Sequence, residues 1–183
     1  MSQVCSQSGH RSCDQDGSKF MEIKSKLTNK SGQELDVIYY ENLDPNQNLE
    51  DKILQAVCAY CFCGDKMVLV KHPRIGWMPP GGHIEEGETI EETTVREVKE
   101  ETNMKVLHQE LIGFQDIYEP GQTIRQPRVF CLVEPYGDFV PSPEEDITEI
   151  KLIDPKDYKQ YFNWLKIGDR IMERALEIKQ SLK

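Results

Sequence analysis

The sequence predicts a layered domain of the α/β or α+β class, in which several short strands are combined with two main helices. Short runs rich in β-branched and aromatic residues, separated by Gly- and Pro-containing turns, recur between residues 54 and 153. The stretch 89–102 lacks Gly and Pro and is rich in helix-forming Glu, Lys and Arg, which predicts a first helix. Apolar residues at helical spacing over 165–182 predict a second one. With 183 residues, the chain is long enough for one domain and an appendage.

The first 49 residues are expected to lie outside the main domain. Residues 1–19 contain very few large apolar side chains, which predicts a disordered tail. Cys5, His10 and Cys13 in this tail lack a fourth metal ligand at a useful distance, so a structural zinc site is not expected. Residues 20–49 are predicted to form an extension with strand composition at 34–41. This extension is expected to pair either with the main domain or with a second subunit in a homodimer.

The main domain is expected to cover residues 50–183. Its predicted elements begin with a strand at 54–63, a tight turn at Gly64 and Asp65, and a hairpin partner at 66–71. After a loop at 72–80 and the acidic helix come strands or strand pairs at 106–118, 128–134 and 147–153, a loop at 136–145, and the C-terminal helix.

Composition excludes several classes of function. The formal net charge is −10 and no basic stripe is present, which disfavours binding to a nucleic-acid polymer. No run of 18 apolar residues predicts a membrane span, and the N-terminus lacks the layout of a secretory signal. Cys58 and Cys61 are three apart on a predicted strand and therefore face opposite ways, which is unsuitable for a shared metal. Unpaired cysteines of this kind indicate a reducing compartment, and the cytoplasm is the expected location.

The acidic helix carries the strongest functional signal. Thr89 and Glu92 form a predicted capping box at its start, and Asn103 suits its end because Asn tolerates a left-handed backbone. Glu97, Glu100 and Glu101 then fall along one side of the helix, where like charges repel. Such a cluster is either a solvated acidic face or a site for hard cations such as Mg²⁺ or Mn²⁺.

The spacing around this helix resembles the Nudix box. Gly82 is followed after five residues by Glu88, after seven more by the run REVKEE at 96–101, and then by Thr102, Asn103 and Met104. The family pattern is matched at every position except Asn103, where Gly is usual. The resemblance implies a Nudix-like α/β/α sandwich with a mixed sheet, a loop–helix–loop that carries the box, and a C-terminal helix.

The resemblance also implies roles for individual residues. Glu97, Glu100 and Glu101 would bind metal and take part in catalysis, with the Gly81 carbonyl and the Glu85 carboxylate as further ligands. An ion pair between Arg96 and Glu88, next to Gly82, would fix the loop on the helix and orient Glu97. The general base is expected to be either Glu97 or a loop glutamate, for which Glu144, Glu145 and Glu149 are the candidates.

The predicted reaction is hydrolysis of a diphosphate linkage. A carboxylate cluster repels a phosphate anion unless divalent ions lie between the two, and such ions also activate water. The expected substrate is a small nucleoside diphosphate derivative. Pro120, 16 residues after Met104, favours ADP-ribose or another nucleotide sugar, with Arg128, Tyr118 and Phe114 as candidate substrate contacts. The alternatives are a hydrolase of modified nucleoside triphosphates and a nucleotide sensor without catalytic activity.

Overall fold

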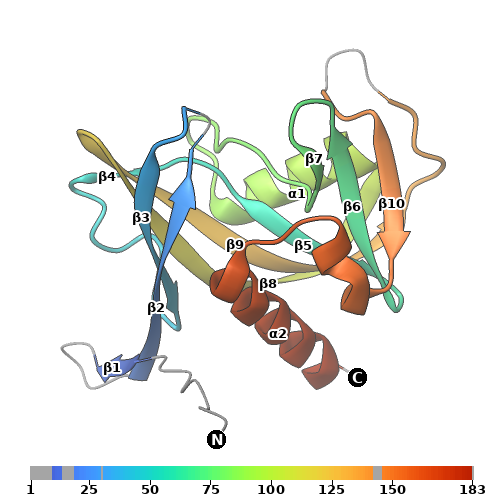
Figure 1. Cartoon of the computed structure of the whole chain (residues 1–183). Coiled ribbons are helices and arrows are strands. Elements are labelled where there is room, and N and C mark those ends of the chain that lie inside the picture. The colour runs from blue at the N-terminus through green and yellow to red at the C-terminus, as the bar shows by residue number, and fades with distance from the viewer. Residues whose placement is uncertain (1–9, 14–18, 30, 142–145, 183) are drawn as a thin grey trace, which may run out of the picture.

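One mixed sheet organises the chain in the computed structural model, which describes residues 10–13, 19–29, 31–141 and 146–182 (Figure 1). Within these residues the strands follow the order β1-β2-β3-β8-β9-β5-β6-β10, while β4 pairs with β9 and β7 with β6. Their bounds are β1 (His10–Cys13), β2 (Lys19–Thr28), β3 (Glu34–Glu41), β4 (Lys52–Leu54), β5 (Cys58–Cys63), β6 (Lys66–His72), β7 (Gly76–Met78), β8 (Met104–Glu119), β9 (Gln122–Pro135) and β10 (Glu149–Ile153). The sheet is mixed because β4 and β5 run parallel to β9 and the other pairs are antiparallel.

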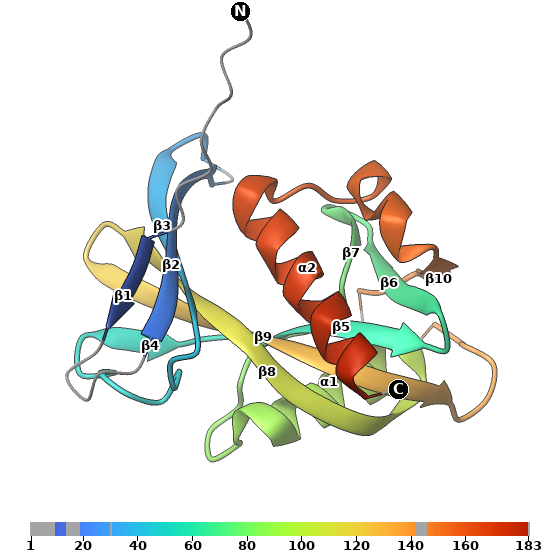
Figure 2. The same cartoon turned by 90° about the horizontal axis from the view of Figure 1, so that it is seen from below.

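The two main helices cover opposite faces of this sheet. Along β5, Tyr60 and Phe62 pack in the core under α2 (Leu165–Ser181), whereas Ala59 and Cys61 pack in the core under α1 (Ile90–Thr102). Strand residues alternate between faces, so one buried strand serves both cores. Figure 2 shows α2 lying across one face and α1 on the other side of the sheet. The predicted α/β/α sandwich is confirmed.

The N-terminal extension is part of the same sheet. β3 pairs with β8 of its own chain in antiparallel register, and β2 adds to the outer edge of β3. The sequence left open whether this segment pairs with the main domain or with a second subunit, and the structure shows pairing within the chain. β1 hydrogen-bonds to the free edge of β2, so residues 10–13 form a strand where a disordered tail was expected. An exposed strand edge is a template for such pairing. Cys5 lies outside the described residues.

The segment around residues 54–63 differs from the single strand that the sequence predicts. It is divided into β4 and β5, because the backbone between them bonds to the glycine-containing loop instead of continuing one ladder. Between the two strands, Val57 N–H donates to the Gly82 carbonyl at 2.9 Å, and at the start of β5, Ala59 N–H donates to the Pro80 carbonyl at 2.8 Å. The loop that enters α1 is thereby fixed to the centre of the sheet.

β8 and β9 are longer than predicted. They form one hairpin around a two-residue turn at Pro120 and Gly121, where Gly121 has a φ of 84°. Three more elements were not predicted: β2, which precedes the expected strand at 34–41, β7, which lies inside the expected loop 72–80, and a short 3₁₀ helix, η1 (Pro155–Gln160), before α2. The described helices include none that is both long and apolar enough to span a membrane.

Candidate active site

The caps of α1 form as the sequence predicts. Glu92 N–H donates to the Thr89 hydroxyl at 3.1 Å, and Thr89 N–H donates to the Glu92 carboxylate at 2.9 Å, which completes the capping box. At the other end Asn103 has a φ of 53°, and its backbone N–H donates to the Lys99 carbonyl. Its side-chain amide also donates to the Asp138 carbonyl at 3.0 Å. Asn103 therefore supplies the left-handed cap for which glycine is usual.

Arg96, in the middle of α1, is the centre of an ion-pair network between the helix and the loop that precedes it. Its Nε and Nη2 donate to the two oxygens of Glu88 at 2.8 and 2.9 Å. Nη1 donates to Glu97 at 2.8 Å and to Glu100 at 3.1 Å, and Nη2 also donates to the His83 carbonyl at 2.9 Å. The Arg96 bonds, helped by a bond from the Thr93 hydroxyl, hold the pKa of Glu88 down at about 2. The same carboxylates raise the pKa of Arg96.

Gly81 and Gly82 let the loop approach the helix closely. Gly81 has a φ of 152°, and a Cβ on it would overlap the Val57 carbonyl. Its backbone N–H donates to the Glu101 carboxylate at 2.8 Å. A Cβ on Gly82 would overlap the Glu97 carboxylate. Both glycines are therefore needed for the two carboxylates to lie against the loop.

The carboxylates of this cluster are oriented by positive partners. Glu97 and Glu101 are each 8% exposed and lie one helical turn apart, the first held by Arg96 and the second by the Gly81 N–H. In this arrangement, no three acidic, His or Cys side chains among the described residues converge as a metal site does. The donor set still fits a hard divalent cation, because carboxylate oxygens are the ligands that Mg²⁺ and Mn²⁺ prefer.

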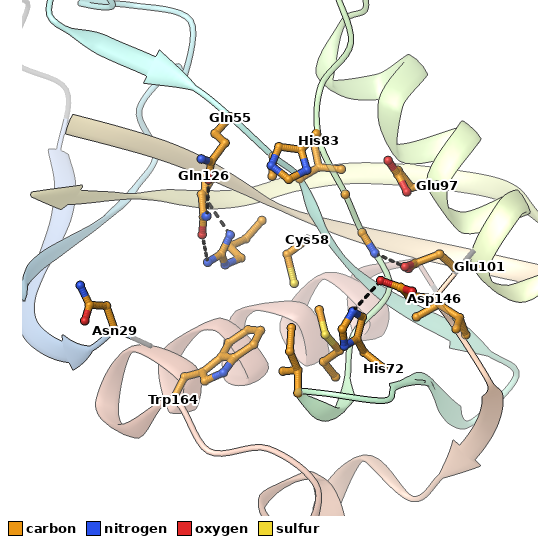
Figure 3. A pocket seen from close by; sticks show the side chains of 18 of the residues that line it. Asn29, Gln55, Cys58, His72, His83, Glu97, Glu101, Gln126, Asp146 and Trp164 are labelled. Atoms are coloured by element: carbon orange, nitrogen blue, oxygen red, sulfur yellow. Dashed lines mark hydrogen bonds and ion pairs between the residues drawn. The ribbon is translucent and has the colours of Figure 1, made fainter. Parts of the chain in front are cut away.

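A cavity of about 1190 Å³ adjoins these carboxylates (Figure 3). Glu97 and Glu101 lie at one side of it, and Gln55, Gln126 and Trp164 at the other. The turn between β2 and β3 contributes a further part of the wall through Thr28, Asn29 and Ser31. The N-terminal extension therefore helps to shape the cavity.

The candidate residues named from sequence are placed differently with respect to this cavity. Glu85, Arg96 and Arg128 line it together with the glycine pair, Glu97 and Glu101. Glu100 is on α1 but outside the cavity lining, bonded to Arg96. Phe114 and Tyr118 lie elsewhere: Phe114 is buried beneath the Arg125 guanidinium, 4.2 Å from the ring centroid, and Tyr118 is partly exposed on β8. Neither reaches the cavity.

The glutamates suggested as a general base have separate positions. Glu149 is on β10, forms an ion pair with Lys71 at 2.5 Å, and does not line the cavity. Glu144 and Glu145 lie outside the described residues.

Several cavity residues were missed by sequence reasoning. Asp146 follows the acidic loop and lies 3.3 Å from His72 Nε2. Arg74 N–H donates to the other ring nitrogen of His72 at 3.1 Å, so the proton of the neutral imidazole is on Nε2 and faces Asp146. Asp146 directly follows Glu144 and Glu145 in the sequence, and this position could have identified it as a further candidate acid. No spacing in the sequence links Gln126 or Trp164 to the acidic helix.

Comparison with known proteins identifies the family of the chain. The model of the NUDIX domain matches residues 52–175. Two Bacillus subtilis proteins match shorter segments: the uncharacterized Nudix hydrolase YvcI is 39% identical over 62 residues, and YtkD, a putative 8-oxo-dGTP diphosphatase, is 40% identical over 78. These segments cover 33% and 43% of this chain and 39% and 49% of the relatives, so the chain spans less than half of either.

Solved structures share the fold at low sequence identity. A variant of the Bacillus subtilis pyrophosphohydrolase BsRppH superposes with a TM-score of 0.65 at 19% identity, covering 84% of this chain and 96% of that one. The NUDIX domain of Shewanella oneidensis NrtR, solved with ADP ribose, gives 0.55 at 20% identity over 74% and 93% of the two chains. The box predicted from the sequence, its geometry around Arg96 and the match over residues 52–175 lead to one conclusion: the protein belongs to the Nudix hydrolase family.

Proposed function

We propose that the protein is a divalent-metal-dependent hydrolase of a nucleoside diphosphate linked to another moiety. The observation that carries this proposal is the placement of Glu97 and Glu101, one turn apart and held in position, at one side of a cavity. The cavity of about 1190 Å³ is large enough for a nucleotide derivative, since ligand pockets typically measure about 300–1,000 Å³.

Each residue of the cluster has a role in this proposal. Glu97, Glu101 and Glu100 would hold Mg²⁺ or Mn²⁺, with Glu85 and the Gly81 carbonyl as further ligands. A bound ion of this kind lowers the pKa of a coordinated water and neutralises phosphate charge. Arg96 orients Glu97, while Glu88 fixes Arg96, as expected for groups that support a metal ligand. The proton of the attacking water would pass to a carboxylate, either Glu97 or a loop acid such as Glu145.

Two finer substrate classes are candidates. ADP-ribose or another nucleotide sugar was the first expectation, and the NrtR domain was solved with ADP ribose. The sequence argument for it rests on Pro120, which is in the β8–β9 turn and does not line the cavity. A nucleoside triphosphate is the second candidate, favoured by the partial match to YtkD, a putative 8-oxo-dGTP diphosphatase.

The test is metal-dependent phosphate release from a panel of compounds. ADP-ribose, a GDP-sugar, a dinucleoside polyphosphate, NADH, dGTP and 8-oxo-dGTP would be incubated with Mg²⁺ or Mn²⁺, with a coupled phosphatase to reveal new phosphomonoesters. Turnover of any compound that requires metal and is lost in Glu101→Gln supports the proposal. Tight binding of a panel member without turnover would replace it with a sensor function.

A further inference from the structure

Three arginines of the described chain use the same edge of the guanidinium to hold a carboxylate. This edge presents the donors on Nε and Nη2, which together match two acceptors in one plane. The pairs are Arg96 with Glu88, Arg125 with Asp116, and Arg170 with Glu41, and the six donor–acceptor distances lie between 2.7 and 2.9 Å. In each case the protein itself supplies both acceptors.

Arg128 differs from these three. Its side chain is 4% exposed, and its Nε has no hydrogen-bond partner. Nη2 donates to the Gln126 side-chain oxygen at 3.2 Å, and Nη1 donates to the carbonyls of Gln126 and Pro127, each at 3.2 Å. No acidic side chain among the described residues forms an ion pair with it. A buried donor without an acceptor costs about 1–3 kcal/mol, and more when it is charged. The Nε–Nη2 edge of Arg128 is therefore suited to two acceptors from a ligand.

The surroundings of Arg128 suit a planar heterocycle. Arg128 lines the cavity that also contains Glu97 and Glu101. The indole ring of Trp164 lies over its guanidinium, with 5.6 Å between the central carbon and the ring centroid. The amide of Gln126 donates to that of Gln55 at 3.2 Å. Figure 3 shows Gln55, Gln126 and Trp164 across the cavity from Glu97 and Glu101. Aromatic faces and amide groups are the usual partners of nucleobases.

We propose that Arg128, supported by Gln126 and Trp164, recognises the O6 and N7 acceptors of a 6-oxopurine, so that the substrate is a nucleotide derivative with a 6-oxopurine base such as guanine. This inference rests on the proposed function, in which the diphosphate lies at the carboxylate side of the cavity. The Nε–Nη2 edge of arginine matches the O6 and N7 atoms of guanine. Adenine places its N6 amino donor where O6 would be, and this donor opposes the donors of Arg128. The subsite therefore favours GDP-linked over ADP-linked compounds.

Access to this edge requires a small side-chain movement, because the Nε atom is buried. Trp164 is partly buried, and it precedes Leu165, whose φ of 52° is unfavourable for a bulky residue. Strain of this kind often occurs beside binding sites. A base that enters beside Arg128 would change the environment of the indole, so Trp164 fluorescence provides a second readout.

The experiment measures binding without turnover. The full chain would be titrated by calorimetry, with Mg²⁺ present, against the α,β-methylene diphosphates of guanosine, inosine, 7-deazaguanosine and adenosine, none of which can be hydrolysed at that bridge. Guanosine and inosine should bind roughly 5- to 150-fold more tightly than adenosine, the range expected for one bidentate base contact, and 7-deazaguanosine should bind with an intermediate affinity. The 7-deaza compound lacks only the N7 acceptor, so it isolates one of the two bonds.

Arg128→Lys keeps the charge but removes the planar pair of donors. It should reduce the preference for guanosine over adenosine by at least about 3-fold, because the planar fork that spans O6 and N7 is lost, while leaving Mn²⁺ affinity unchanged. Arg74→Lys, which changes an exposed arginine outside the cavity lining, is the matched control and should retain the preference. If Arg128→Lys does not fold, the wild-type series of four compounds decides alone.

Equal binding of the four compounds, or binding of none, would overturn the inference. Binding of inorganic phosphate that is lost in Arg128→Lys would also overturn it and would assign the subsite to an anion. Guanosine preference without phosphate release from any substrate would contradict the proposed function and leave this inference standing. Metal-dependent phosphate release with no base preference would support the proposed function and overturn this inference.

Discussion

The two sides of the cavity differ in how their arginine is satisfied. At the carboxylate side, the Nε and Nη2 donors of Arg96 are both bonded to Glu88, and Nη1 is left to hold Glu97. At the other side, the same edge of Arg128 has a single contact, to the Gln126 amide, and Nε has none. An arginine whose Nε and Nη2 donors are both bonded to a carboxylate of its own chain is held in one orientation. An arginine whose edge stays open within the protein is suited to recognition of a ligand.

Loss of a carboxylate at the carboxylate side of the cavity should have the largest effect on activity. Glu101→Gln preserves shape and the acceptor for the Gly81 N–H but removes one charge from the metal site. We expect kcat to fall by about 10²-fold or more, with little change in thermal stability. Glu91→Gln alters an exposed acid in the first turn of the same helix and is the control. Near-native turnover of Glu101→Gln would show that the cluster does not hold the catalytic metal.

Substitution of Glu88 should leave the Nε and Nη2 donors of Arg96 without a carboxylate partner, as those of Arg128 are among the described residues. Glu88→Gln removes the carboxylate that fills this edge, so Arg96 can reorient and Glu97 loses its fixed position. We expect metal affinity or kcat to decrease by about 10- to 100-fold, as for other groups that support a metal ligand. The exposed neighbour Glu86 provides the matched variant Glu86→Gln. Equal activity of the two variants would mean that the ion pair is a surface feature only.

Substitution of the glycine pair tests whether the position of the Glu97 carboxylate matters independently of its charge. Gly82→Ala introduces a methyl group where the Glu97 carboxylate lies, so the carboxylate must move while its charge is retained. We expect a loss of kcat of roughly 10- to 100-fold, because misplacement by about 1 Å has effects of this size. The melting temperature should change less than in Gly81→Ala, in which the methyl group would meet the Val57 backbone. A stable Gly82→Ala variant with full activity would remove Glu97 from the mechanism.

Acidic pH should weaken the ion pair between Glu88 and Arg96. The folded-state pKa of Glu88 is about 2, below its ordinary value of 4.5, so its stabilising contribution is complete above about pH 4.5. This contribution is lost as the pH falls toward 2, because protonation removes the partner of Arg96. The difference in melting temperature between wild type and Glu88→Gln should therefore shrink from pH 6 to pH 3. A difference that is constant over this range would contradict the pairing.

The smallest effect is expected for Asn103→Gly. Glycine accepts the φ of 53° more readily, but it gives up the bond from the Asn103 amide to the Asp138 carbonyl. These changes oppose each other, so the free energy of unfolding should change by less than about 1 kcal/mol, as measured by urea denaturation. Activity should be unchanged. A large loss of activity would indicate a chemical role for the Asn103 side chain.

Most of the carboxylate side of the cavity could be predicted from the sequence, whereas on the other side only Arg128 was named as a candidate. The capping box, the end of α1 at Asn103 and the approach of Glu88 to Arg96 depend on residues close together in the chain, where helix geometry fixes the spacing. Gln55, Gln126 and Trp164 come together only because β9 pairs with β4 and β5 and α2 packs over the sheet. Phe114 and Tyr118 were expected at the substrate, but nothing in the local sequence distinguishes a core aromatic residue from a stacking one.

We propose that Glu97 and Glu101 hold a divalent cation against the glycine loop. The most direct test is a Mn²⁺ titration of the full chain followed by electron paramagnetic resonance, in which free Mn²⁺ gives a signal that decreases on binding. We predict that Glu97→Gln and Glu101→Gln each weaken Mn²⁺ binding by at least about 10-fold, whereas Arg128→Lys and Glu91→Gln leave it unchanged. Wild-type Mn²⁺ affinity in both cluster variants would show that these two glutamates do not bind the ion.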